Sequence, residues 1–89
     1  MATEDQKHKV WAQAATVRGK DPNLYRKDPY GKIMYKPSYG KVSAMGWEVD
    51  HIVPSARGGS NSTGNLQALN TSINRQKGAS LMKRSRHSR

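Results

Sequence analysis

The stretch that decides the fold lies at residues 46–54, which read GWEVDHIVP. Trp47 and Val49 alternate with acidic residues, and this two-residue period is typical of a strand with one apolar face. Pro54 ends the pattern, because proline cannot donate a hydrogen bond to a strand ladder. We therefore predict a strand over residues 47–53, with Asp50 and His51 near its end.

The residues that follow predict a hairpin and a helix. Residues 55–64 are mostly Ser, Gly and Asn, which favours an exposed loop, and residues 66–69 (LQAL) suit a second strand or extended piece. Asn70 or Thr71 is able to cap a helix over residues 72–83, which Gly78 would weaken or end early. If this helix crosses the hairpin, Asn74 in its first turns faces Asp50.

The residues before this stretch give weaker signals. Apolar residues at helical spacing predict a helix over residues 7–18 that packs on the core. Residues 20–46 contain several Pro and Gly turns, with a short strand over residues 32–35. Four Tyr alternate with basic residues in this region. They would either line a nucleic-acid backbone or fill the core, and we favour the core.

The composition limits the class of protein. A chain of 89 residues suits a single domain, here 1–89, and no internal repeat or second domain is visible. Sixteen Lys and Arg oppose six Asp and Glu, a net charge of +10, which favours nucleic acid as a partner over acidic proteins, membranes or ribosomes. The absence of Cys excludes disulfides and cysteine zinc sites. No secretory signal or membrane span is visible, so we expect no membrane partner and a cytoplasmic or nuclear location.

Three side chains suggest a hydrolytic site. Hydrolysis of a phosphodiester needs a base for water and positive charge on the developing oxyanion. His51 is the one His in an ordered context, and an imidazole suits the first task. Asp50 and Asn74 offer oxygen ligands, which suit a hard ion such as Mg²⁺ and suit Zn²⁺ poorly. The alternatives are a structural His, a surface acid and an ordinary residue at a helix start.

The motifs over residues 46–78 resemble the HNH endonuclease family. They read Asp-His-Ile-x-Pro, then Gly58-Gly59, then Asn-Leu-x-x-Leu from Asn65, and finally Asn-x-x-Lys-Gly from Asn74. The resemblance implies an α+β fold with a ββα-metal core, namely a β-hairpin and a crossing helix, to which the first helix is an addition. It implies a metal-dependent DNA endonuclease that nicks double-stranded DNA with low sequence specificity.

The same resemblance implies a role for each residue. His51 is similar to the general base, Asp50 and Asn74 to the metal ligands, and Asn65 to the middle Asn that holds the loop and helps to orient the base. Glu48 would lie behind the ligands and hold a basic side chain. We expect several basic side chains to bind phosphates, namely those of Arg57, Arg75, Lys77, Lys83 and Arg84. Each of them could instead be an ordinary solvated charge.

Two departures from the family pattern bear on the metal. Its last motif residue is often His, whereas Asn74 stands here, which favours Mg²⁺, with Mn²⁺ or Ni²⁺ as alternatives. Its paired zinc-binding Cys are missing, so no structural zinc is expected and packing around Trp47, Leu66, Leu69 and Ile73 must hold the hairpin. The basic tail over residues 83–89 would be a phosphate-binding arm, a localisation signal or a solvated end.

Two rival functions remain at this stage. One is a nucleic-acid-binding module that keeps the fold without cutting, and the other is a basic structural protein of ribosomes or packaging. The sequence leaves open whether the protein is a monomer or a homodimer.

Overall fold

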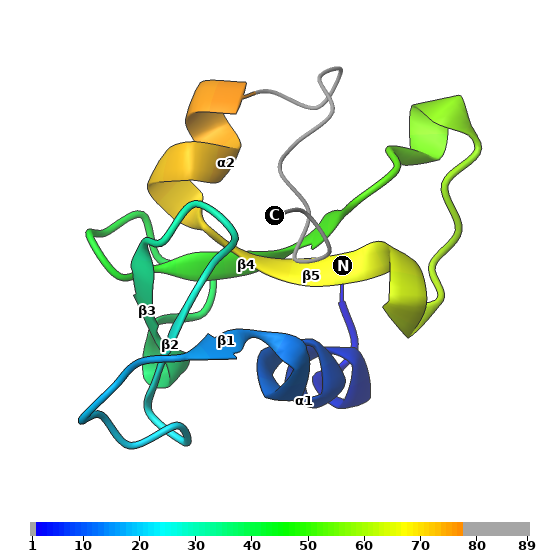
Figure 1. Ribbon diagram of the computed structural model, residues 1–89. Helices are drawn as coiled ribbons and strands as arrows, with labels where there is room; N and C mark the ends of the chain where they lie inside the picture. Colours follow the sequence, from blue (N-terminus) through cyan, green and yellow to red (C-terminus); the bar gives the residue numbers. More distant parts are fainter. Residues whose placement is uncertain (1, 78–89) are drawn as a thin grey trace.

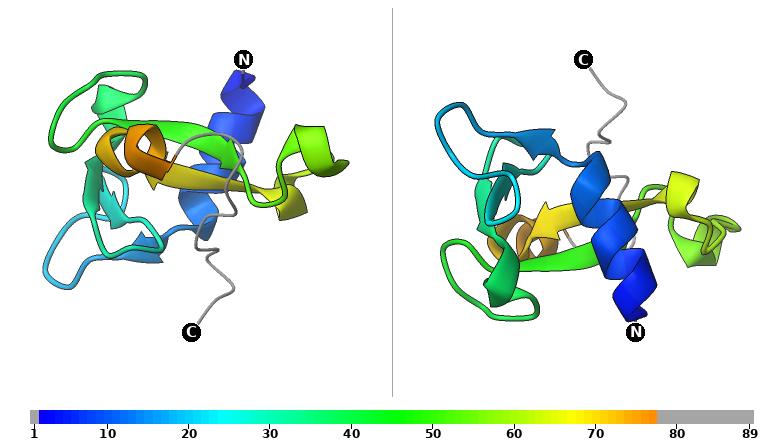
Figure 2. Two further views of the ribbon diagram at one scale, coloured as in Figure 1. Left: turned by 90° about the horizontal axis from the view of Figure 1, so that it is seen from above. Right: turned by 90° about the horizontal axis from the view of Figure 1, so that it is seen from below.

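The hairpin of β4 (Trp47–His51) and β5 (Leu66–Asn70) forms the centre of the molecule, with α1 (Glu4–Gln13) on one face and α2 (Thr71–Lys77) on the other (Figure 1). The computed structural model describes residues 2–77, and the side chains of residues 2–75. Figure 2 shows α1 crossing one face of the hairpin and α2 crossing the other. The elements are α1 (Glu4–Gln13), β1 (Ala15–Thr16), β2 (Tyr25–Lys27), β3 (Ile33–Tyr35), η1 (Lys36–Ser38), β4 (Trp47–His51), η2 (Ser55–Arg57), η3 (Thr63–Asn65), β5 (Leu66–Asn70) and α2 (Thr71–Lys77).

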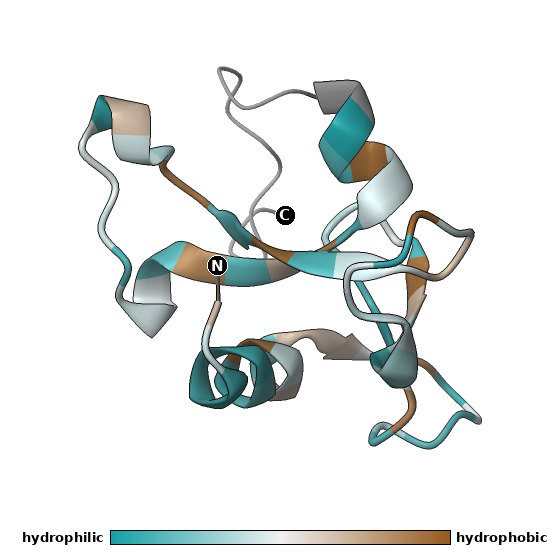
Figure 3. Ribbon diagram, turned by 180° about the vertical axis from the view of Figure 1, so that it is seen from behind, coloured by the Kyte–Doolittle hydropathy of each residue, from teal (hydrophilic) through white to brown (hydrophobic). Residues whose placement is uncertain are grey.

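The hairpin and α2 form the predicted ββα unit, and the fold is α+β as expected. β4 pairs antiparallel with β5, so that Trp47 lies opposite Asn70 and His51 lies opposite Leu66. Figure 3 shows a hydrophobic segment between hydrophilic ones along β4. All five residues of β5 are buried, because a helix covers each face of the hairpin. The second strand is one residue longer than the predicted 66–69, whereas the first ends at His51 instead of residue 53.

The start of α2 is fixed by Asn70, one of the two predicted caps. Its Oδ1 accepts hydrogen bonds from the backbone N and the hydroxyl of Ser72, at 2.9 and 2.6 Å. Its Nδ2 donates to the carbonyls of Ile33 and Ala44, at 3.2 and 2.9 Å. The buried Asp28 carboxylate accepts from the Asn70 backbone N at 3.0 Å. The first turn of α2 is thus tied to the other sheet, which positions Asn74. Gly78 and the predicted end of the helix lie outside the described residues.

The first helix begins and ends earlier than the predicted residues 7–18. Thr3 and Gln6 form a capping box, in which each side chain accepts a hydrogen bond from the other residue's backbone N, at 3.1 and 2.9 Å. At the other end, β1 pairs with β2, and Arg26 donates to the carbonyls of Ala12 and Ala14 at 3.2 and 2.9 Å. The helical spacing misled the prediction, because strand pairing satisfies the backbone beyond Gln13 instead.

β1, β2 and β3 form a three-stranded antiparallel sheet beside the hairpin. The short strand predicted over residues 32–35 is confirmed as β3, whereas β1 and β2 were not predicted. None of the helices in the described part of the chain is long and apolar enough to cross a lipid bilayer.

Three aromatic rings form the middle of the core between α1 and the hairpin. Trp47 is 2 % exposed, and its ring centroid lies 4.9 Å from those of both Trp11 and Tyr39. Its indole nitrogen donates to the carbonyl of Lys36 at 3.0 Å. Trp47, Leu66 and Leu69 are buried as expected, while Ile73 and all four tyrosines are only half-buried.

Candidate active site

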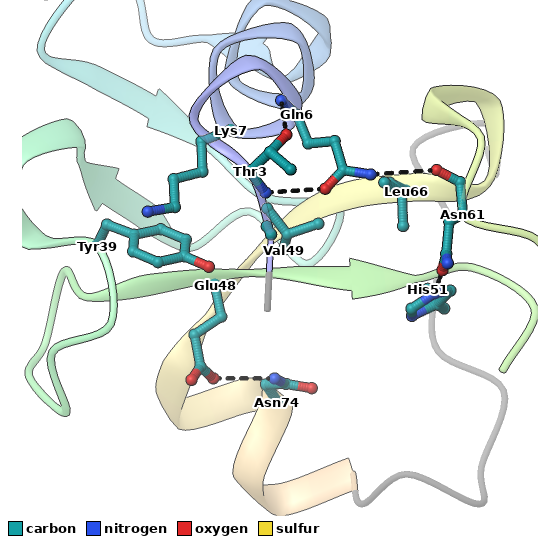
Figure 4. A pocket seen from close by; sticks show the side chains of 11 residues that line it. Thr3, Gln6, Lys7, Tyr39, Glu48, Val49, His51, Asn61, Leu66 and Asn74 are labelled. Carbon is teal, nitrogen blue, oxygen red and sulfur yellow. Dashed lines mark hydrogen bonds between the residues drawn. The ribbon is translucent and has the colours of Figure 1, made fainter. Parts of the chain in front are cut away.

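A cleft of about 880 Å³ runs along β4 between the first turns of α1 and the helix α2 (Figure 4). His51 and Asn74, two of the predicted site residues, both line it. Glu48 lines it as well, whereas Asp50 is not among its lining residues. Within the described residues, the lining comprises Ala2, Thr3, Gln6, Lys7, Tyr39, Glu48, Val49, His51, Asn61, Leu66 and Asn74.

The His51 imidazole has a partner in the loop that sequence reasoning missed. Its Nε2 lies 2.7 Å from Oδ1 of Asn61, as Figure 4 shows. The loop "SNSTGN" over residues 60–65 offers two Asn and several hydroxyls, so no signal in the sequence separates Asn61 from its neighbours. The ordinary consequence of such a bond is that one ring orientation is favoured over others.

Asn65 fastens the loop from both sides. Its Oδ1 accepts from the Val53 backbone N at 2.8 Å, and its Nδ2 donates to the carbonyls of Val53 and Ser60 at 3.1 and 2.7 Å. The glycine pair allows this path: Gly58 has a φ of 86°, and a Cβ at Gly59 would overlap the Val53 carbonyl. The Asn65 side chain therefore spans the loop that carries Asn61.

Asn74 is held by Glu48. The Asn74 Nδ2 donates to Oε1 of Glu48 at 3.0 Å, and both residues are half-buried. The sequence predicts that Glu48 holds a basic side chain and that Asn74 faces Asp50; the bond found for Asn74 goes to Glu48, two positions earlier on the same strand face. A carboxylate accepts but does not donate, so it selects the orientation that turns Oδ1 of Asn74 away from it. Figure 4 shows this oxygen pointing away from Glu48.

One comparison with known proteins gave a match. The family model of the HNH endonuclease matches residues 38–80, which include β4, the loop, β5 and α2. Residues 38–80 are therefore similar to an HNH endonuclease domain. Such a domain indicates nuclease-type activity on nucleic acids, and HNH nucleases generally use a divalent metal ion. No curated protein and no solved structure matches the chain.

The oxygen donors of Asp50 and Asn74 fit a hard cation. Asp50 is buried (9 % exposed) on the strand face that it shares with Glu48, and it lies next to His51 in the chain. Carboxylate and amide oxygens are the ligands that Mg²⁺ prefers. Within the described residues, no three His, Cys, Asp or Glu side chains cluster into a metal site. A site built from one carboxylate and one amide does not need such a cluster.

Among the described residues, one basic side chain lines the cleft, and it is not one of the predicted cations. Arg57 and Arg75 are exposed, while the Lys77 side chain, Lys83 and Arg84 lie outside the described residues. Lys7 was missed by sequence reasoning: its Nζ lies in the cleft, 4.1 Å from the Tyr39 ring centroid and 2.7 Å from Oε2 of Glu4. The hydrogen bond to Glu4 raises the pKa of Lys7, so this side chain stays cationic.

Lys7 and Gln6 come from α1, which lies outside the residues that the family model matches. The sequence did hold a signal for them, since the order Thr-x-x-Gln from Thr3 is a capping box. Recognising it would have placed the start of α1 correctly, but not its position against the cleft.

Proposed function

We propose that this protein is a metal-dependent DNA endonuclease that hydrolyses phosphodiester bonds, with His51 as the general base. The observation that carries the proposal is the arrangement of His51, Asn74 and Glu48 around a single cleft. His51 comes from the end of β4 and Asn74 from α2, so the fold brings together residues that are 23 positions apart in the chain.

His51 would take the proton of the attacking water. The neutral imidazole has one nitrogen with a lone pair, which is able to accept this proton. Asn65 would act indirectly, through the loop that it fastens beside His51.

Asp50 and Asn74 would hold a divalent metal ion, with Mg²⁺ preferred and Mn²⁺ or Ni²⁺ as alternatives. When bound, the ion supplies positive charge for the developing oxyanion and for the leaving oxygen. Glu48 would keep the Asn74 amide with its oxygen free for this purpose. Removal of the metal with EDTA should therefore stop cleavage.

The substrate that fits best is double-stranded DNA with little sequence preference. The net charge of +10 favours a polyanion, and Lys7 in the cleft together with the exposed Arg57 and Arg75 would contact phosphates. One active site cuts one strand at a time, so a monomer should convert supercoiled plasmid to the nicked form first. Direct conversion to the linear form would indicate a dimer instead.

Plasmid nicking tests the proposal. Supercoiled DNA is incubated with the protein in Mg²⁺, Mn²⁺, Ni²⁺, Zn²⁺ or EDTA, beside His51→Ala and the matched control His8→Ala, whose side chain is exposed on α1. We expect metal-dependent nicking that His51→Ala lowers by about 10²–10⁴-fold and His8→Ala leaves unchanged. DNA binding in a gel shift should survive in His51→Ala. Tight, salt-sensitive binding without cleavage in any metal would overturn the proposal in favour of a binding module that keeps the HNH fold.

A further inference from the structure

The contact between His51 and Asn61 carries information about the proton on the imidazole ring. The atom of Asn61 that lies 2.7 Å from Nε2 is Oδ1, an amide oxygen that accepts hydrogen bonds and donates none. A short contact of this kind requires the hydrogen to lie on Nε2. In a neutral imidazole with its hydrogen on Nε2, the basic lone pair is on Nδ1.

Asn61 is itself held in place, although its side chain is exposed. Asn65 binds the backbone on both sides of it: Nδ2 of Asn65 donates to the Ser60 carbonyl at 2.7 Å, and the Asn65 backbone N donates to the Ser62 carbonyl at 2.9 Å. Asn65 thus fixes the path of the loop at Asn61.

A second support for Asn61 comes from α1. The Nε2 of Gln6 lies 3.4 Å from the Asn61 carbonyl, to which it donates, and the Oε1 of the same amide accepts from the Thr3 backbone N at 2.9 Å. Figure 4 shows these contacts as one line from Thr3 through Gln6 and Asn61 to His51. Gln6 therefore caps α1 and contacts the loop with a single side chain.

We propose that Asn61 is a positioning residue that fixes the tautomer and orientation of His51, and that Gln6 of α1 supports it. In consequence, α1 belongs to the working unit of the nuclease although it lies outside the matched residues 38–80. The inference rests on the proposed function for the task of His51, but the tautomer itself can be measured without cleavage.

The test of the tautomer is long-range ¹H–¹⁵N correlation spectroscopy of the full chain, recorded at a pH above the usual titration range of imidazole. The variants are Asn61→Ala, Asn61→Asp and the matched control Asn23→Ala, which removes the same atoms from an exposed turn outside the cleft. We expect the wild type and Asn23→Ala to carry the His51 hydrogen on Nε2. Asn61→Ala should give a mixture of the two tautomers, and Asn61→Asp should restore the single form, because a carboxylate oxygen also accepts from Nε2.

Two results would overturn the proposal. One is a wild-type His51 with its hydrogen on Nδ1, and the other is an Asn61→Ala spectrum identical to that of the wild type. The signal of His8 serves as an internal reference, since His8 does not contribute to the cleft lining.

A nicking assay then tests the consequence for cleavage. Asn61→Ala should lower the maximal rate by about 10- to 100-fold, the range found when a partner that orients a functional imidazole is removed. DNA affinity should stay unchanged, and Gln6→Ala should lower the rate by a smaller factor because Asn65 still holds the loop. An Asn61→Ala protein that nicks at the wild-type rate would contradict the positioning role. A wild type that nicks in no metal would refute the proposed function, while the spectra would still decide whether Asn61 sets the tautomer.

Discussion

Trp47 should contribute more to the stability of this protein than any exposed residue, because three sets of contacts meet on its ring. It is 2 % exposed, it packs against Trp11 and Tyr39 with ring centroids 4.9 Å away, and its indole nitrogen donates to the Lys36 carbonyl. Truncation of a buried Trp to Ala costs about 3–5 kcal/mol, from lost transfer energy and the cavity left behind. At about 4–8 °C per kcal/mol in a domain of this size, the midpoint of thermal unfolding should fall by roughly 12–40 °C.

Trp47→Phe separates the ring from its hydrogen bond. Phe keeps much of the apolar volume but leaves the Lys36 carbonyl without its donor, so we expect a loss of about 1–2 kcal/mol. The matched control is Val42→Ala, since Val42 is 69 % exposed and should change stability by less than about 0.5 kcal/mol.

The measurement is urea unfolding followed by far-ultraviolet circular dichroism, with thermal melts of the same variants. The predicted order of stability is wild type and Val42→Ala, then Trp47→Phe, then Trp47→Ala. If Trp47→Ala unfolds at the same urea concentration as Val42→Ala, the hairpin does not depend on this aromatic cluster, and the inference that packing around Trp47 stabilises the hairpin is wrong.

Three further substitutions test the site. Asn74→Ala should weaken the use of metal, and raising the Mg²⁺ concentration should recover part of the nicking rate; no recovery at any concentration would argue against a ligand role. Glu48→Gln should lower the apparent Mg²⁺ affinity about tenfold in metal titrations of nicking. The substitution removes a negative charge near the ligands, and the neutral amide no longer selects the orientation of the Asn74 side chain. Asn65→Ala should destabilise the protein by about 1–3 kcal/mol in urea unfolding, because it leaves the Val53 N–H and two loop carbonyls without a partner; an unchanged midpoint would show that the loop does not depend on it.

The strand, hairpin and second helix could be predicted because their signals are local. Alternation over residues 47–50, the Ser, Gly and Asn composition of the loop and the cap at Asn70 each depend on neighbours in the chain. The α+β class followed from their order together with the motifs, and the match to the HNH endonuclease model agrees with the resemblance. Helical spacing alone was less reliable: the segment after Gln13 joins β1, because pairing with β2 and the Arg26 side chain satisfy its backbone.

The partners of the site residues were decided by the tertiary structure. Glu48 rather than Asp50 receives the hydrogen bond of Asn74, since the start of α2 is fixed by contacts of Asn70 with Asp28, Ile33 and Ala44, all distant in the chain. Periodicity tells which strand face a residue occupies, but it does not tell where along that face a crossing helix will lie.

The same reason explains why the contribution of α1 to the cleft was not predicted from the sequence. The sequence by itself determined the type of chemistry, because an imidazole, oxygen ligands and a strongly basic chain are properties of composition and spacing. Only the fold brought Gln6 beside the Asn61 carbonyl, 55 positions away, and turned Asn61 toward His51. Contacts between residues so far apart in the chain depend on how whole helices and strands pack against each other. Local sequence patterns therefore do not predict them.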